Sequence, residues 1–187
     1  MKRIVVGLSG ASGSIYGIRI LEALKPQKEV ETHLIITRAA EKTLHQETET
    51  TVQEVKDLAD FCYSNEQIGA AVASGSFLTD GMVIVPCSIN TMSSIASGTT
   101  SNLLTRAADV TLKERRRLVL CVRETPLHLG HLRTLATLTE MGAVVAPPMP
   151  AFYQHPKTID DLVSATVERL LDLVMLPHSK TKRWDGI

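Results

Sequence analysis

The stretch that decides the fold is KRIVVGLSGASG at residues 2–13, which leads directly into IYGIRILEAL at residues 15–24. A β-branched apolar run ends at three glycines spaced by three, Gly7, Gly10 and Gly13, and an amphipathic helical pattern then begins. A turn of small residues leaves its backbone N–H groups unobstructed, and a helix N-terminus adds the positive end of its dipole. This order of strand, turn and helix therefore predicts an α/β fold with a phosphorylated ligand at its first turn.

The glycine loop alone leaves two interpretations open. Its spacing is GxxGxxG, which differs from the GxGxxG of dinucleotide-binding folds, and no GK[ST] follows it. The loop is therefore equally compatible with phosphate binding and with a tight strand-to-helix turn that needs small residues for packing.

The composition fits one domain that lacks an electrostatic affinity for nucleic acid. At 187 residues the chain is long enough to bury an ordinary core. Its 20 Lys and Arg balance 20 Asp and Glu, whereas a nucleic-acid-binding domain is expected to carry a basic excess or stripe. Aromatic residues make up only 4% of the chain, so we expect an aliphatic core. We expect a single domain over 1–187, with 177–187 as a polar tail that contains Trp184.

The sequence also favours a cytoplasmic protein that does not enter a membrane. The N-terminal MKR leads straight into a strand pattern, and no apolar run approaches the length of about 18 residues that a membrane span needs. Cys62, Cys87 and Cys121 are odd in number and widely spaced. The last two lie in or beside apolar strands, where cysteine behaves as a small hydrophobic residue. This usage is typical of a reducing compartment.

Apolar runs and helical patterns alternate along the whole chain. Strands are predicted at 3–8, 32–36, 81–85, 118–122 and 143–146, and helices at 14–24, 39–47, 52–59, 90–96, 103–116, 129–141 and 159–176. Such alternation predicts right-handed βαβ units and a parallel sheet that is covered on both faces. Ligands of such sheets bind beyond the carboxyl ends of the strands. We therefore expect residues 7–13, 37–38, 86–91 and 123–126 to converge.

Two of these segments carry polar side chains whose role the sequence leaves open. PCSINT at 86–91 follows a buried strand, so its Ser, Asn and Thr are candidates either to cap the next helix or to bind a ligand. Arg123 and Glu124 follow the next strand. Glu124 is a candidate general acid or base if partial burial raises its pKa, and the alternative is a surface ion pair with Arg123.

Two helical patterns have similar alternatives. Arg106, Asp109 and Lys113 share one helical face, so they form either a salt-bridged surface or a phosphate clamp. His128 and His131 are three residues apart, but no third ligand with suitable spacing accompanies them. We therefore expect no metal site.

Taken together, six segments in order resemble the UbiX/Pad family of flavin prenyltransferases. They are GLSGASGSIYG at 7–17, ASGSF at 73–77, DGMVIVPCSINT at 80–91, NLLTRAADVTLKERR at 102–116, LVLCVRETPL at 118–127 and MGAVVAPPMPAFYQHP at 141–156. The resemblance implies a flavodoxin-like, Rossmann-type doubly wound fold in a homo-oligomer, typically a dodecamer. It also implies a metal-independent enzyme that transfers a dimethylallyl group from dimethylallyl phosphate to N5 of reduced FMN and closes a ring at C6. The prenylated FMN then serves a UbiD-type decarboxylase.

The resemblance also implies roles for individual residues. The matching FMN contacts are Gly10, Ala11, Ser12, Thr37, Ser88, Ile89, Asn90, Thr91 and Arg123. The matching contacts to the prenyl phosphate are Arg106, Lys113, Tyr153 and Arg169, several of them supplied by neighbouring subunits, and Ser74, Gly75 and Glu47 line the same cavity. The implied catalytic residues are Ser12, Glu47, Lys113 and Glu124.

One departure and two alternative functions accompany the resemblance. Arg133 and Thr134 replace the acid and amide that relatives carry after the residue matching His131, which puts helix packing or assembly in question more than chemistry.

One alternative is a flavin-dependent decarboxylase of an aromatic or peptidyl-cysteine substrate, for which His45 is the nearest candidate histidine. The other alternative is a non-catalytic subunit that binds or delivers FMN. Similarity is nearest to the branch associated with hydroxyarylic acid decarboxylation, and the sequence does not identify the acid.

Overall fold

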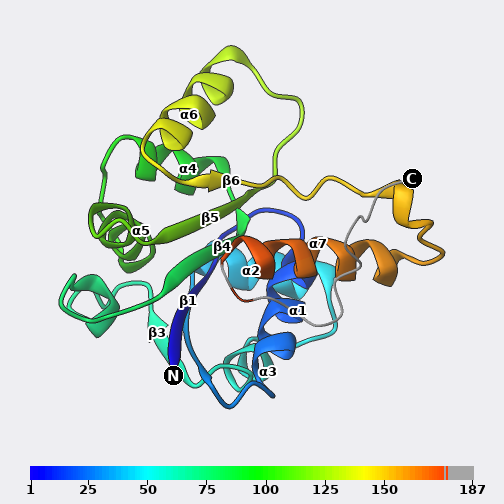
Figure 1. Cartoon of the computed structure of the whole chain (residues 1–187), viewed down its shortest axis with the longest axis horizontal. Coiled ribbons are helices and arrows are strands. Elements are labelled where there is room, and N and C mark those ends of the chain that lie inside the picture. Colours follow the sequence, from blue (N-terminus) through cyan, green and yellow to red (C-terminus); the bar gives the residue numbers. More distant parts are fainter. Residues whose placement is uncertain (175, 177–187) are drawn as a thin grey trace.

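A six-stranded parallel sheet organises the chain in a computed structural model that describes residues 1–174 and 176 (Figure 1). The strand order is β3-β2-β1-β4-β5-β6. The strands are β1 (Lys2–Leu8), β2 (Val30–Ile36), β3 (Phe61–Ser64), β4 (Gly81–Cys87), β5 (Arg117–Val122) and β6 (Val144–Val145). This is the 3-2-1-4-5-6 order of Rossmann-type sheets, whose switch point lies between β1 and β4. The predicted doubly wound α/β fold is confirmed.

Helices cover both faces of the sheet, and the two core clusters show which helix lies where. The helices are α1 (Ser14–Leu24), α2 (Arg38–Glu47), α3 (Val52–Lys56), α4 (Ile89–Ala96), α5 (Leu103–Lys113), α6 (Leu129–Glu140) and α7 (Ile159–Leu173), with 3₁₀ turns η1 (Ala71–Ala73) and η2 (Phe152–Gln154). Helices α1, α2, α3 and α7 pack in one cluster, and α4, α5 and α6 pack in the other. None of the helices among residues 1–174 is long and apolar enough to cross a membrane.

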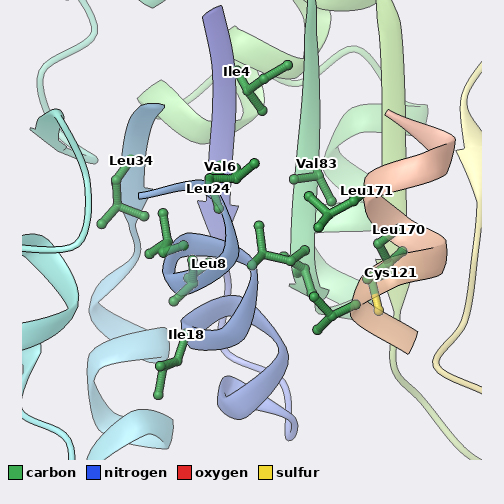
Figure 2. Close-up of a cluster of buried hydrophobic side chains, with 14 of the residues drawn as sticks. Ile4, Val6, Leu8, Ile18, Leu24, Leu34, Val83, Cys121, Leu170 and Leu171 are labelled. Carbon is green, nitrogen blue, oxygen red and sulfur yellow. The ribbon is translucent and has the colours of Figure 1, made fainter. Parts of the chain in front are cut away.

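The core is aliphatic, as the composition predicts. Figure 2 shows Ile4, Val6 and Leu8 of β1 facing side chains of α1 and α7, including Leu171. All seven residues of β4 are buried, because a central parallel strand is covered by helices on both sides. Each fully buried Leu or Ile contributes about 1.5–3 kcal/mol through removal of its surface from water. The core thus holds the carboxyl ends of β1 and β4 in place beneath the candidate site.

The structure differs from the sequence-based expectations at one strand and at several ends. Strand β3 was not predicted, because it is a four-residue edge strand, FCYS, with no buried residue to give it a pattern. The helix predicted over 103–116 ends at Lys113, since Arg115 adopts a left-handed backbone conformation with φ 57°. The helices predicted over 52–59 and 159–176 end at Lys56 and Leu173, and the strand predicted over 143–146 spans only Val144–Val145. The tail 177–187 with Trp184 lies outside the described residues, so the single domain over 1–187 stays a prediction.

A buried histidine joins the edge strand β3 to the rest of the sheet. The His33 ring on β2 is 2% exposed and stacks on Phe61 and Tyr63, with ring centroids 5.1 and 5.9 Å apart. Its Nε2 lies 3.0 Å from Glu31 Oε1, and its Nδ1 lies 3.0 Å from the Tyr63 hydroxyl. Burial lowers the pKa of His33 despite the opposing effect of Glu31, with a further contribution from Arg3.

We expect the free energy of unfolding to fall as the pH is lowered through about 6.5, the pKa of histidine in an unfolded chain. The unfolded chain takes up a proton there, whereas folded His33 resists protonation because its pKa is lowered, so the stabilisation is full above this pH and is lost below it. Urea unfolding between pH 5 and 8 measures the effect. His33→Gln should flatten the dependence, and the exposed His45→Gln should not. Equal slopes in both variants would contradict this assignment.

Candidate functional site

The four loop segments predicted to converge do meet at the carboxyl edge of the sheet. Thr37 N donates to Leu8 O at 3.0 Å, and Ser9 N donates to Pro86 O at 3.2 Å. Arg123 N donates to Cys87 O at 3.0 Å. Residues following β1, β2, β4 and β5 are therefore joined directly to one another around the switch point, where open α/β sheets bind their ligands.

Ser9 locks the first loop to the loop that follows β4. It is 2% exposed; its hydroxyl donates to Pro86 O at 2.9 Å and accepts from Ser88 N at 2.7 Å. Both of its hydrogen bonds are internal to the protein. Ser9 therefore fixes the relative position of the two loops.

The glycine loop packs closely against the start of α2. A Cβ built on Gly10 would lie 2.4 Å from Ala39 Cβ and 3.1 Å from the Ala39 carbonyl carbon. Neither neighbour is a flexible side chain, so only glycine fits at position 10. Gly13, with φ 109°, turns the chain into α1, a conformation that residues with a Cβ rarely adopt.

The N-terminus of α1 binds an anion from the protein itself. The Glu47 carboxylate accepts from Gly13 N and Ser14 N, both at 2.9 Å. Desolvation tends to raise the pKa of Glu47, but hydrogen bonds from the Ser12 hydroxyl and from these two N–H groups outweigh it and lower the pKa. The sequence placed a phosphate at this helix end, whereas the structure places Glu47 there. A ligand phosphate therefore needs other donors.

Two further helices begin at the same edge with side-chain caps. The Ser88 hydroxyl accepts from Thr91 N at 3.3 Å at the start of α4, and the Thr37 hydroxyl accepts from Ala40 N at 3.1 Å at the start of α2. The capping alternative for residues 86–91 is therefore confirmed, and it leaves the exposed Asn90 side chain at the rim. Ile89 and Ala11 are partly exposed beside it.

Arg123 and Glu124 are exposed at the end of β5. Glu124 Oε1 accepts from Thr125 N at 2.9 Å, just before the cis peptide bond that joins Thr125 and Pro126. The ion pairs formed among residues 1–174 and 176 do not include an Arg123–Glu124 pair. The surface ion pair between Arg123 and Glu124 that the sequence offered as an alternative is therefore not formed.

A second group of predicted residues gathers on α5. Arg106 Nη1 lies 2.8 Å from Asp109 Oδ2, and Lys113 pairs with Glu114. These contacts confirm the salt-bridged interpretation of this helix within one chain. A Cβ on Gly75 would lie 2.7 Å from Lys113 Nζ, so Ser74 and Gly75 lie beside the same cations.

The remaining two predicted contacts to the prenyl phosphate lie elsewhere. The exposed Arg169 lies on α7, which packs on the sheet face that α1 covers, whereas α5 lies on the opposite face (Figure 1). Tyr153 is 59% exposed in η2, the 3₁₀ turn between β6 and α7. One chain therefore does not bring Arg106 and Lys113 together with Arg169. These groups can share a site only across subunits.

The histidines singled out in the sequence serve structural roles. The rings of His128 and His131 are in contact, tilted by 31° with centroids 3.6 Å apart, and His128 Nδ1 accepts from Gly130 N to cap α6. Among the described residues, no three His, Cys, Asp or Glu side chains form a metal-binding group. His45 is exposed in the last turn of α2. Arg133 is exposed, and the Thr134 hydroxyl donates to Gly130 O within its own helix.

Comparison with known proteins agrees with this geometry. The model of the Flavoprotein family matches residues 1–171. "Flavin prenyltransferase UbiX" of Escherichia coli K12 is 54% identical over 188 residues, which cover 100% of both chains. The chain belongs to the UbiX family of flavin prenyltransferases. The resemblance found in the sequence is thereby confirmed.

Two solved structures of UbiX proteins superpose closely on the chain. A dodecameric FMN-dependent UbiX-like decarboxylase from Escherichia coli O157:H7 has a TM-score of 0.96 and 44% identity, covering 98% of this chain and 100% of its own. AnUbiX (PadA1), solved in complex with FMN and dimethylallyl pyrophosphate, has a TM-score of 0.96 and 47% identity, covering 100% of this chain and 98% of its own.

Proposed function

We propose that this protein transfers a dimethylallyl group from dimethylallyl phosphate to N5 of reduced FMN and closes a ring at C6, acting as a homo-oligomer in the cytoplasm. The product, prenylated FMN, would serve a UbiD-type decarboxylase. The observation that carries the proposal is the full-length match to UbiX flavin prenyltransferases, together with a crevice that joins the loops after β1, β2, β4 and β5. The free cysteines Cys62, Cys87 and Cys121 are in keeping with a reducing compartment.

Reduced FMN would lie across the switch point. Gly10, Ala11 and Ser12 would contact it from the first loop, Thr37 from the start of α2, and Ser88, Ile89, Asn90, Thr91 and Arg123 from the loops after β4 and β5. The fit rests on polar groups that converge from separate strands and on the close approach of loop and helix at Gly10. The Ser12 hydroxyl donates to Glu47 and is thereby held at the rim of the crevice. It is our candidate for orienting the flavin at N5.

The prenyl phosphate would be bound at a subunit boundary. Arg106, Lys113, Ser74 and Gly75 would come from α5 and its neighbouring loop in one subunit, and Tyr153 and Arg169 from another. This arrangement accounts for the placement of the two groups on opposite sheet faces. A dodecamer, as in the Escherichia coli O157:H7 relative, supplies such a boundary.

The chemistry needs a stabilised leaving group and a dry site. When bound, reduced flavin supplies an electron-rich N5 and then C6. As the allylic C1–O bond breaks, negative charge grows on the departing phosphate, and Arg106, Lys113, Arg169 and the Tyr153 hydroxyl would stabilise it. Ring closure joins C6 to the prenyl alkene, which gains one proton as C6 loses one, and Glu124 would relay that proton. Excluding water protects the allyl carbon from hydrolysis.

We expect anaerobic incubation with reduced FMN and dimethylallyl phosphate to yield a flavin that carries five additional carbons, detected by mass spectrometry. Inorganic phosphate should appear in equal amount, because one C–O bond breaks for each adduct. The control omits the prenyl phosphate. Unchanged FMN from protein that still binds it would contradict the proposal, and turnover of an aromatic acid by the chain alone would favour the decarboxylase alternative.

A further inference from the structure

We propose that Arg116 is a positioning residue for the prenyl phosphate site. It fixes the 73–79 segment, which runs from η1 to the loop before β4, and through that segment it fixes Arg106 and Lys113. The inference rests on the proposed function, because it assigns those two cations to the prenyl phosphate.

The Arg116 guanidinium holds the 73–79 segment at three points. Nη2 donates to Gly75 O at 2.6 Å, and Nη1 donates to Phe77 O at 2.9 Å and to Thr79 Oγ1 at 3.3 Å. Residues 74–79 form no helix or strand, and this one side chain binds three of them. A planar guanidinium with five donors suits three separated acceptors, and a single ammonium does not.

A local backbone turn aims Arg116 at this segment. Helix α5 ends at Lys113, and Arg115 takes the left-handed conformation with φ 57°. Arg116 N then donates to Thr111 O at 2.9 Å. The chain thus folds back against the end of the helix, which brings Arg116 to the same segment that Lys113 contacts.

Both α5 cations are positioned by the segment that Arg116 holds. Arg106 Nε donates to Ala73 O at 3.2 Å. Lys113 and its partner Glu114 both lie against Gly75, where a Cβ would come within 2.7 Å of Lys113 Nζ and 2.2 Å of Glu114 Oε1. If the segment moved away, Arg106 would lose a backbone acceptor, and the Lys113–Glu114 ion pair would lose the backbone against which it packs.

A second anchor at the far end of the segment keeps the fold intact without Arg116. The Phe77 ring lies 4.8 Å from the Arg3 guanidinium carbon and 5.2 Å from the His33 ring centroid, and Asp80 accepts from Arg3 N at 2.7 Å. Loss of Arg116 should therefore shift residues 73–76 more than the core. The proposed FMN contacts lie on other elements, so the effect should fall on the prenyl phosphate alone.

The test compares Arg116→Gln, Arg116→Lys and the control Arg117→Gln, which removes the same charge from an exposed neighbour. We expect Arg116→Gln to raise KM for dimethylallyl phosphate about tenfold or more, since charge-assisted hydrogen bonds are lost, with KM for FMN within about twofold. Arg116→Lys should recover only part of the loss. Arg117→Gln should match the wild type.

Three results would overturn the inference: an unchanged KM for dimethylallyl phosphate in Arg116→Gln, full recovery in Arg116→Lys, or an equal rise in KM for FMN. The first result would show that Arg116 has no role in binding the prenyl phosphate. The second would show that only its positive charge matters, and the third that it supports the structure as a whole. If Arg116→Gln does not fold, the Lys variant decides alone, because a selective rise in KM must remain. If the wild-type chain forms no adduct, the proposed function is refuted instead. Calorimetric titration of dimethylallyl phosphate into the FMN-loaded variants then tests the positioning role of Arg116 separately.

Discussion

Replacing Lys113 with alanine is expected to reduce prenyl transfer by about a hundredfold or more, in line with the loss of one charged group that stabilises a transition state. The Lys113→Ala variant should still bind FMN, since α5 lies on the sheet face away from the glycine loop and α1. Single-turnover product formation and flavin titration measure the two quantities separately. Lys28→Ala, an exposed lysine at the opposite edge of the sheet, is the matched control and should retain full activity.

The same variant tests how the site is assembled. Lys113→Ala and Arg169→Ala chains should each be inactive alone. When the two are co-expressed, activity should return at up to about a quarter of the sites, because each site would draw its two cations from different subunits of a symmetric oligomer. No recovery would place both cations in one chain and contradict the subunit boundary. Prenyl transfer at the wild-type rate by Lys113→Ala would contradict the catalytic role of Lys113, whereas the absence of prenyl transfer from the wild type would favour the flavin-delivery alternative.

Replacing Gly10 with alanine is expected to weaken FMN binding by tenfold or more, because inserting a methyl group into a close-packed contact costs about 1–3 kcal/mol. The added Cβ would lie 2.4 Å from Ala39 Cβ, and α2 is fixed from behind by the buried Ala40 and Leu44. The loop must therefore move, and it carries Ala11 and Ser12 with it. Flavin fluorescence titration measures the change.

Gly69→Ala provides the control for this substitution. A Cβ at Gly69 meets nothing within 4 Å, so the same chemical change should leave FMN affinity unaltered. If Gly10→Ala binds FMN as tightly as Gly69→Ala does, then the close approach of the loop to α2 has no part in flavin binding.

The sequence was most informative where structure is set by local order and by topology. The run from β1 through the glycine loop to α1 was predictable because strand, turn and helix follow one another without interruption. The meeting of residues 7–13, 37–38, 86–91 and 123–126 was predictable because the carboxyl ends of parallel strands share one edge. Strand β3 was missed because an exposed edge strand lacks the buried pattern that reveals a central one.

Long-range partners could not be predicted from spacing. Glu47 reaches Gly13 across 34 residues, and nothing in its helical surroundings distinguishes it from the neighbouring Glu41 and Glu49. Arg115, Arg116 and Arg117 look alike in the sequence, and only the left-handed turn at Arg115 decides which of them faces the 73–79 segment. The family resemblance did single out Glu47, as a residue of the cavity, but it did not indicate its contact with Gly13, and nothing in the sequence singled out Arg116.

The carboxylate of Glu47 at the start of α1 bears on how the enzyme recycles. In this chemistry FMN enters as a reactant and departs with its new ring, so the crevice must stand empty once in every cycle. A loop that depended on the ligand phosphate for its shape would lose that shape at each departure, and the entropy of ordering it would oppose every new encounter. Because the Glu47 carboxylate already binds the amides of Gly13 and Ser14, the end of the loop stays preorganised between turnovers.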